Sequence, residues 1–256
     1  MLKNLLAHPL TQELSLDDPR VTSLRTKIVK EKKFLNKIYT YWYQMIIQQL
    51  PISPLPVLEL GTGPGFLKEL LPELITSDVI PCQNVDILLD GQQLPFTDRS
   101  LKAVVMVDVL HHVQNPRLFF TSAARCVQAG GCILMIEPWN TRWSRWVYTH
   151  LHHENFDPNA QEWLLNSTKP LSEANGALPW IMFSRDSAQF SREFPFWKID
   201  IIQPIMPMAY LLSGGFSTKL GPPAWFFPFC QTIENSMTPL NPHIAMFALV
   251  VLRRLE

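Results

Sequence analysis

The sequence predicts an α/β protein built on a mostly parallel β-sheet with helices on both faces. Between residues 57 and 139, short apolar runs alternate with segments of helical periodicity. This alternation is typical of parallel sheets with helical crossover connections. A glycine-rich turn follows the first apolar run, as in nucleotide-binding folds. The 256 residues, 47% of them hydrophobic, can form one large domain or one domain with an elaborated cap.

The most informative segment is the turn that carries Gly61, Gly63 and Gly65. It follows the apolar run 57–60, so we expect a buried strand that leads through a tight turn into a helix. Glycine permits positive φ angles and lets a ligand approach the main chain closely. The first amides of the helix then favour an anionic group. We therefore expect a nucleotide or nucleoside to bind here, and a purely structural turn is the alternative.

The spacing of the glycines separates two classes of ligand. The dinucleotide motif G-x-G-x-x-G has its third glycine five residues after the first, but that position is Phe66 and the third glycine is Gly65. Glu59 precedes the first glycine by two residues, where a carboxylate would repel a pyrophosphate and attract a cationic amine. Both features favour a nucleoside that carries an amine. A dinucleotide site is the weaker alternative.

Acidic residues follow the next predicted strands in a regular order. Asp78 lies 19 residues after Glu59 (78 − 59 = 19) and ends a short apolar stretch. Nucleoside-binding α/β folds place the carboxylate that binds ribose at about this interval. Asp90 and Asp108 end two later apolar stretches. All three carboxylates are therefore expected at the carboxyl edge of the sheet, where such folds bind ligands.

The other core elements follow from the same alternation. Asn115 can cap a helix that carries Phe119, Ala123 and Val127 on one face and ends at the glycine pair 130–131. Only six residues separate the second strand from the third, so the helix between them is lost or reduced to a turn. The helix after the glycine turn is short as well, stopping near residue 72. Strands are expected over 57–60, 74–78, 85–89, 103–107, 132–136, 197–203 and 244–252.

Three of these segments resemble the class I S-adenosylmethionine-dependent methyltransferases, specifically the type 11, quinone-methyltransferase-like family. They are the acidic-x-G-x-G-x-G motif at 59–65, the stretch 90–101, similar to D-A-x-x-L-P-F-x-D-x-S-F-D, and the V-L-H-H-V segment at 109–113. The ordered segments extend over roughly eighty residues. The resemblance implies a Rossmann-like, seven-stranded sheet with an antiparallel last strand and helical and aromatic cap insertions. It also implies S-adenosyl-L-methionine as cofactor.

The resemblance further implies that ten residues contact this cofactor. Glu59 is expected near its methionine portion, Asp78 at its ribose, Asp90 at its adenine amine and Asp108 at its ammonium group. Backbone of the turn and of the segment after Asp90 supplies the remaining contacts, at Gly61, Thr62, Gly63, Gly65, Gly91 and Leu94. Each carboxylate has a plainer alternative: a strand end satisfied by amides, a solvated turn, a turn-initiating aspartate or a helix cap.

Catalytic residues are harder to predict from the sequence than binding residues, because methyl transfer from a sulfonium depends mainly on positioning the acceptor in a dry site. A general base helps only if the acceptor loses a proton. His112 follows the fourth predicted strand, where the donor methyl is expected, and is our candidate base. Glu137, at the end of the fifth strand, is the second candidate. A histidine bound to a backbone carbonyl is the alternative for His112.

A histidine-rich segment at 150–154 invites a metal interpretation. His150 and His153 are expected on one face of a helix, with His152 and Glu154 beside them. The spacing is not H-E-x-x-H, and no second ligand group with characteristic spacing occurs elsewhere. We therefore interpret this segment as a polar helix face and expect no metal.

Aromatic residues are concentrated in the second half of the chain. Trp139, Trp143 and Trp146 have the spacing of one helical stripe. A Pro-rich aromatic excursion over 204–242 can form a lid, line an apolar substrate pocket or rest on a membrane interface. We expect lid and pocket, with Tyr39, Trp42 and Tyr43 closing the pocket from the other side. Peripheral membrane contact is left open.

Composition narrows the partners further. The net charge is +0 and the pI about 7.1, which removes the electrostatic basis for a nucleic-acid partner. The four cysteines show no metal or pairing pattern, so we expect reduced thiols in a cytoplasmic protein, and the first ten residues lack the apolar run of a signal peptide. The short basic segment 27–33 is interpreted as a solvated helix face. We divide the chain into an N-terminal helical cap (1–50), a cofactor-binding core (51–139), a helical insert (140–196) and a C-terminal strand pair with the aromatic excursion (197–256).

The sequence thus predicts an enzyme that methylates a small lipophilic or aromatic acceptor at oxygen or carbon. Two alternatives remain at this point: a non-catalytic protein that binds S-adenosylmethionine, and an NAD-dependent oxidoreductase. The acceptor and the oligomeric state do not follow from the sequence.

Overall fold

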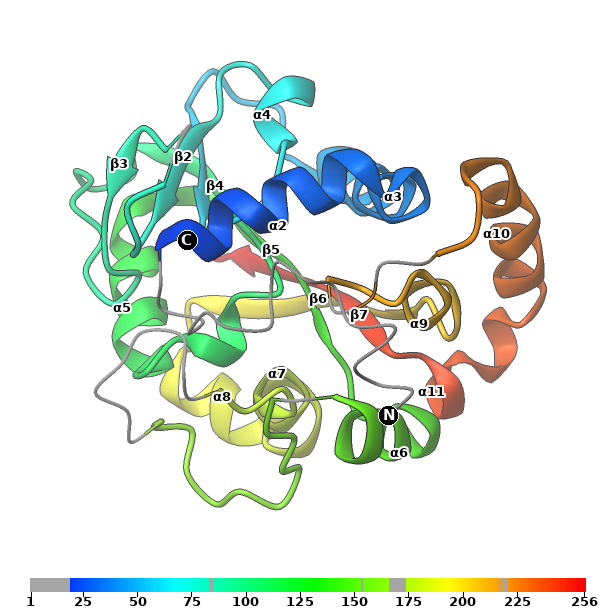
Figure 1. The fold of residues 1–256 in the computed structure, drawn as a ribbon. Coiled ribbons are helices and arrows are strands. Elements are labelled where there is room, and N and C mark those ends of the chain that lie inside the picture. Colours follow the sequence, from blue (N-terminus) through cyan, green and yellow to red (C-terminus); the bar gives the residue numbers. More distant parts are fainter. Residues whose placement is uncertain (1–18, 83–84, 153, 166–173, 217, 219–220) are drawn as a thin grey trace.

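The computed structural model describes residues 19–82, 85–152, 154–165, 174–216, 218 and 221–256. A seven-stranded sheet runs through its centre (Figure 1) in the spatial order β3-β2-β1-β4-β5-β7-β6. The strands are β1 (Val57–Leu60), β2 (Ile75–Asp78), β3 (Ile87–Leu88), β4 (Leu101–Val107), β5 (Val127–Pro138), β6 (Trp197–Ile205) and β7 (Phe247–Arg254). The chain reverses its direction of winding between β1 and β4. The predicted Rossmann-like fold is confirmed.

The strand directions place one edge of the sheet at a ligand site. β1 to β5 pair in parallel, whereas β7 lies between β5 and β6 and is antiparallel to both. The expected antiparallel last strand is thus present. The carboxyl ends of β1, β2 and β4 meet at one edge beside the switch point, where open α/β sheets form a crevice.

Near-continuous apolar runs make the central strands a double-sided core. All four residues of β1 are buried, and Val104, Ile133 and Leu134 are fully buried in β4 and β5. Such runs are typical of strands covered by helices on both faces. In Figure 1, α3 covers one face, and α5, α7 and α8 cover the other, while α2 lies beside α3.

Local sequence explains where the main helices begin. Asn115 caps α5, its Oδ1 accepting a hydrogen bond from Arg117 N at 3.2 Å, and Pro116 occupies the first turn. Thr141 and Ser144 form a capping box at α6. The helices are α2 (Pro19–Glu31), α3 (Lys33–Gln49), α4 (Leu67–Leu70), η2 (Leu110–His112), α5 (Pro116–Cys126), α6 (Arg142–Leu151), α7 (Leu178–Trp180), η3 (Ile181–Arg185), α8 (Ser187–Glu193), α9 (Ala209–Ser213), η4 (Ala224–Phe226), α10 (Phe227–Ser236), η5 (Thr238–Leu240) and α11 (Asn241–Ile244).

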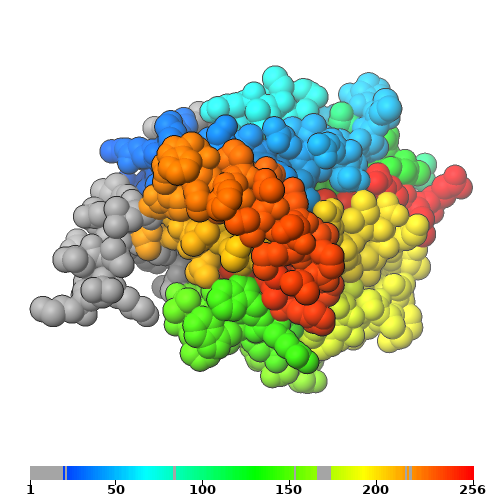
Figure 2. Space-filling view, turned by 90° about the vertical axis from the view of Figure 1, so that its right-hand side faces the viewer, coloured from blue at the N-terminus to red at the C-terminus, as the bar shows by residue number. Residues whose placement is uncertain are grey.

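The aromatic excursion packs on the N-terminal helices. Tyr210 stacks on Trp42 with ring centroids 5.7 Å apart, and Phe227 meets Phe34 edge to face at 5.6 Å. Figure 2 shows the orange excursion lying against the blue helices. Part of the excursion therefore packs into one core with α3. Its role as a lid stays a prediction. Trp225, by contrast, is 76% exposed.

Several predicted boundaries were wrong. α5 ends at Cys126, and Val127 already pairs with Leu101 as the first residue of β5. A register shift then follows, because the glycine pair bulges out before the regular pairing resumes at Cys132. The last strand starts at Phe247, since the proline-containing segment before it forms α11. The short α4 was predicted correctly, as was the absence of a helix among the described residues between β2 and β3.

The predicted tryptophan stripe and the predicted solvated basic face were also wrong. Trp139 is buried but precedes α6, so it does not share a helical stripe with Trp143 and Trp146. Lys32 is not solvated: its Nζ donates to the carbonyls of Ser213 and Gly215 at 2.6 and 2.7 Å, and to that of Thr218 at 3.0 Å.

All four cysteines are free. In the part of the chain that the structure describes, no helix is long and apolar enough to cross a membrane.

Candidate functional site

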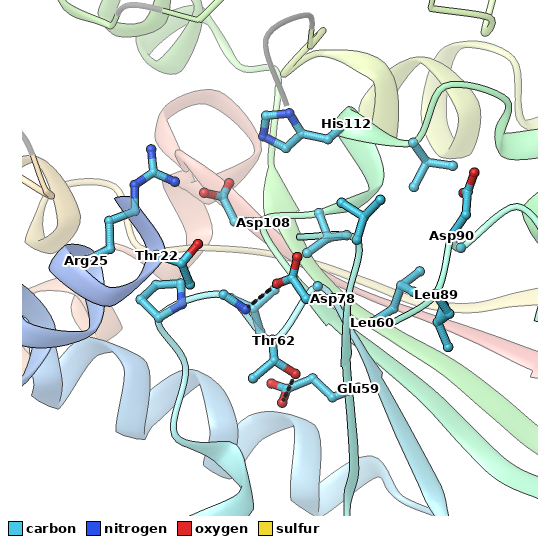
Figure 3. A pocket seen from close by; sticks show the side chains of 18 of the residues that line it. Thr22, Arg25, Glu59, Leu60, Thr62, Asp78, Leu89, Asp90, Asp108 and His112 are labelled. Carbon is cyan, nitrogen blue, oxygen red and sulfur yellow. Dashed lines mark hydrogen bonds between the residues drawn. The ribbon is translucent and has the colours of Figure 1, made fainter. Parts of the chain in front are cut away.

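A cavity of about 180 Å³ lies at the carboxyl edge of β1, β2 and β4 (Figure 3), and two smaller cavities measure about 20 and 40 Å³. Most of the residues singled out in the sequence meet there. The cavity is lined by Glu59, Gly61, Thr62, Gly63, Asp78, Asp90, Gly91, Asp108 and His112. One cavity thus collects residues from four separate strand ends.

The glycine turn has the geometry that its sequence suggested. Gly61 and Gly63 have φ angles of 67° and 49°, in the left-handed region that glycine adopts at low cost. A Cβ on Gly61 would come within 2.7 Å of a Val109 methyl group. A Cβ on Gly63 would meet only the carbonyl oxygen of Gly61, at 3.8 Å. The turn therefore packs tightly under Gly61 and faces open space at Gly63.

Two predicted contact residues lie outside the cavity. A Cβ on Gly65 would lie 2.5 Å from the Tyr43 hydroxyl oxygen, so this glycine allows α3 to pack against the turn. Leu94 is buried, and its amide donates to Ser122 Oγ while its carbonyl accepts from Arg125. The backbone of Leu94 is thus already engaged by the protein. The motif therefore predicted a ligand contact for two residues that do not line the cavity.

Glu59 lies beneath the turn, 3% exposed, and accepts a hydrogen bond from the Thr62 hydroxyl at 2.9 Å. Burial raises the pKa of the Glu59 carboxyl to about 8; the Thr62 hydrogen bond opposes the rise and the charge of Asp78 adds to it. A cation brought to this end of the cavity would stabilise the ionised carboxylate.

The two following carboxylates are held by nearby amides. Asp78 accepts from Gly63 N at 2.9 Å and from Ile80 N at 3.0 Å, which ties β2 to the turn. Asp90 accepts from the backbone and side-chain nitrogens of Gln92 at 2.9 and 2.8 Å. Asp90 therefore initiates a turn, the alternative considered for it, while also lining the cavity.

Beyond β4 the chain turns sharply at Asp108, whose φ is 62°. Its side chain is 36% exposed toward the cavity. Burial raises the pKa of Asp108 to about 6; the His111 charge opposes the rise, and the charges of Glu154 and Glu137 add to it. Asp108 does not cap the following helical turn, for which no side-chain cap is present. His112 lines the cavity on the next turn of chain.

Glu137 does not face the cavity, so the structure does not support it as a base for the acceptor. It is fully buried and accepts from the amides of Val109 and Leu110 at 2.9 and 2.7 Å. Its second oxygen lies 2.8 Å from His111 Nδ1. Glu137 therefore fixes the loop that carries Asp108 and the histidine pair.

The other walls of the cavity are formed by residues outside the glycine turn and the strand ends. Tyr39 and Tyr43 line it as expected, whereas Trp42 points instead toward Tyr210. Thr22, Arg25 and Phe216 also line it and were not predicted. Arg25 lies over the Phe216 ring at 5.3 Å and points toward Asp108 in Figure 3. No local pattern marks Arg25, because a charged residue on an amphipathic helix is ordinary.

The histidine-rich segment does not form one helical face. His150 is exposed on α6, whereas Glu154 lies beyond the helix and reaches back toward His111, with Oε2 3.5 Å from Nε2. His153 lies outside the described residues.

Fold and site together define an α/β protein with a crevice at its switch point, lined by the glycine turn and the strand-end carboxylates. Residues 58–135 match the family described as Methyltransferase domain, and no curated protein matches the sequence. A chain of the Haloferax volcanii complex between the Trm112 methyltransferase activator and a protein described as a methyltransferase is similar in fold. Its TM-score is 0.54 at 16% identity, over 94% of this chain and 98% of that one.

A second similar structure is the Streptomyces coelicolor A3(2) geranyl diphosphate C-methyltransferase with Mg²⁺, geranyl diphosphate and S-adenosyl-L-homocysteine. Its TM-score is 0.54 at 11% identity, covering 98% of this chain and 92% of that one. At these identities the likeness concerns the fold. Residues 58–135 are thus similar to a methyltransferase domain, within a fold that solved methyltransferases share. This match favours the methyltransferase expectation over the oxidoreductase alternative.

Proposed function

We propose that the protein methylates a small lipophilic or aromatic acceptor at oxygen or carbon, with the donor in the cavity above the glycine turn. The observation that carries the proposal is the open space at Gly63, in a turn that is otherwise tightly packed. A ligand can approach the backbone there at a distance that any side chain would prevent. Four carboxylates line the same cavity, which suits a cationic nucleoside.

The cavity offers a group that we can assign to each part of the donor. Glu59 and Asp108 are the groups we assign to the methionine amine, Asp78 to the ribose and Asp90 to the adenine. When bound, S-adenosylmethionine supplies a methyl group on a positively charged sulfur. We assign the sulfur end of the donor to the part of the cavity that Asp108 and His112 line, beside the ends of β1 and β4.

The acceptor is assigned to the part of the cavity that Tyr39 and Phe216 line. Their rings lie edge to face there, with centroids 6.3 Å apart. A flat apolar molecule can pack against such rings and exclude water from the reacting atoms. His112 lies within reach of this space and would accept a proton from an acceptor hydroxyl, a role required only for O-methylation.

The test is to incubate the purified protein with methyl-labelled donor and fractionated cell extract, and to identify the labelled product by mass spectrometry. Label in a small apolar molecule is the expected result, and it should vanish in Gly63→Val. Label found only in protein or RNA would overturn the small-molecule acceptor. Donor bound without any turnover in complete extract would favour a non-catalytic binding protein.

A further inference from the structure

A group of ionisable side chains lies between the donor cavity and the α6 region. It consists of Asp108 and the histidine pair His111 and His112, after β4, with Glu154, after α6; we call these four residues the His111 cluster. Asp108 lines both the large cavity and the adjoining cavity of about 20 Å³, which Glu154 also lines. The cluster thus stands at the boundary of the space assigned to the acceptor.

Glu137 orients the central histidine of this cluster. The hydrogen bond between Glu137 Oε2 and His111 Nδ1 is 2.8 Å long, and the other carboxylate oxygen is held by two backbone amides. Because the carboxylate can only accept, Nδ1 carries a proton, which leaves Nε2 to bind either a second proton or a metal ion. A carboxylate on the far nitrogen is the usual arrangement for a histidine that binds a metal.

His111 Nε2 points at negative charge. His111 is fully buried, and Nε2 makes no hydrogen bond to any residue that the structure describes. Glu154 Oε2 lies 3.5 Å from it and Asp108 Oδ1 3.9 Å. Two carboxylate oxygens facing a buried ring nitrogen require positive charge at that nitrogen, either a proton on Nε2 or a metal ion bound to it.

The separations suit a metal ion. Two ligands that each lie about 2.1 Å from one ion are about 3–4 Å apart, the range found around Nε2. One ring nitrogen of His112 completes a group with His111 and Glu154, in which all three ligand atoms lie within 4.8 Å of one another. Two imidazoles and a carboxylate form the ligand set of catalytic zinc sites and of related divalent transition metals.

We propose that the His111 cluster binds one divalent transition-metal ion of the zinc type. His111, His112 and Glu154 are its ligands, with Asp108 as a fourth or as a neighbour of a bound water. The adjoining cavity of about 20 Å³ has space for one water-sized ligand of the ion.

If the chain methylates the acceptor assigned above, this ion gives the acceptor a polar anchor. A hydroxyl oxygen bound to the ion loses its proton to solvent more readily and is held beside the donor methyl. The C–O bond then forms as the donor C–S bond breaks, and the sulfur leaves as a neutral thioether. This role depends on the proposed function, whereas the binding of the ion does not.

The test is metal binding by the full chain, measured by equilibrium dialysis with Zn²⁺ and, with Co²⁺, by visible absorption. We expect one equivalent of bound Zn²⁺ and a Co²⁺ spectrum with nitrogen ligands. Glu154→Gln should weaken Zn²⁺ binding by at least about tenfold, as should Glu137→Gln through the orientation of His111. His150→Gln, which changes an exposed histidine next to the same loop, is the matched control and should bind Zn²⁺ like the unchanged protein.

Binding without saturation, or equal Zn²⁺ affinity in Glu154→Gln and His150→Gln, would overturn the proposal. The first of these results would indicate that a proton alone joins His111 and Glu154. Gly63→Val separates this inference from the proposed function. It should abolish donor binding and leave the Zn²⁺ affinity unchanged, so that either claim can fail while the other stands.

Discussion

The sharpest prediction concerns Gly63, because the donor site and the strain of the backbone can be separated there. In Gly63→Ala, a residue with a Cβ must adopt a φ of 49°. That costs about 1–2 kcal/mol of unfolding free energy. For a chain of this size, it corresponds to about 2–4 °C in Tm for each kcal/mol. No protein atom other than the Gly61 carbonyl oxygen, at 3.8 Å, lies close to the new methyl group. The fold should therefore survive.

Donor binding should respond far more strongly, since the methyl group enters the space assigned to the ligand. We expect the donor Kd to rise at least about 100-fold, equivalent to about 2.7 kcal/mol. Gly130→Ala is the matched control: Gly130 has a φ of 74°, is exposed, and its added Cβ would meet no atom within 4 Å. The control shares the backbone strain but lies outside the cavity.

Isothermal titration with S-adenosylmethionine and thermal unfolding, run on both variants, would decide the matter. Both should lose similar amounts of stability, and only Gly63→Ala should lose donor affinity. Unchanged affinity in Gly63→Ala would refute the assignment of the cavity to the donor. Equal loss in both variants would show that strain, and not occupied space, controls binding.

Three further predictions follow from the surroundings of the cavity. The folded-state pKa of Glu59, about 8, lies above its ordinary value of 4.5. The stability that this difference gives the free protein is therefore fully present below about pH 4.5 and is lost as pH rises from there to about 8. In that window, urea unfolding should show stability falling by up to about 1.4 kcal/mol per pH unit, and this slope should be absent in Glu59→Gln. Lys32→Met removes the cation that donates to three carbonyls of the segment carrying Phe216, so hydrogen exchange there should accelerate while exchange in the sheet stays unchanged. In Asp78→Asn, the new NH₂ group must face one of the two amides that now donate to the carboxylate, Gly63 N or Ile80 N. Chemical unfolding should show a loss of about 1–3 kcal/mol in unfolding free energy. An unchanged unfolding free energy would contradict this account of the turn.

The sequence predicted the sheet well because its signal is local. β1, β4 and β5 are continuous apolar runs that end in an acidic residue or a glycine turn, and each can be recognised without knowledge of its neighbours. Boundaries failed where tertiary pairing decides them. Val127 has a side chain suited to either state and joins β5 because it pairs with Leu101. The proline-containing α11 likewise delays the start of β7 until Phe247.

Only the residues at the strand ends of the candidate site could be predicted from the sequence. Gly61, Gly63 and the carboxylates directly follow predicted strands, at the positions where nucleoside-binding folds contact their ligand. Its walls come from segments with no motif of their own: Arg25 from α2, and Phe216 from the excursion. The His111 cluster was missed for the same reason. Glu154 lies outside the histidine face expected from spacing, and it approaches His111 only because the chain turns back after α6.

The charges around the cavity give an independent reason to prefer a sulfonium nucleoside over a dinucleotide. Glu59, Asp78, Asp90 and Asp108 all line it, while Arg25 is the one lysine or arginine among the described lining residues. Burial and neighbouring carboxylates raise the pKa values of Glu59 and Asp108, so the free protein holds these groups partly protonated near neutral pH. A ligand with an amine and a sulfonium relieves this crowding and draws both groups into their ionised form. A pyrophosphate would add two negative charges to these carboxylates, and Arg25 alone could not balance them.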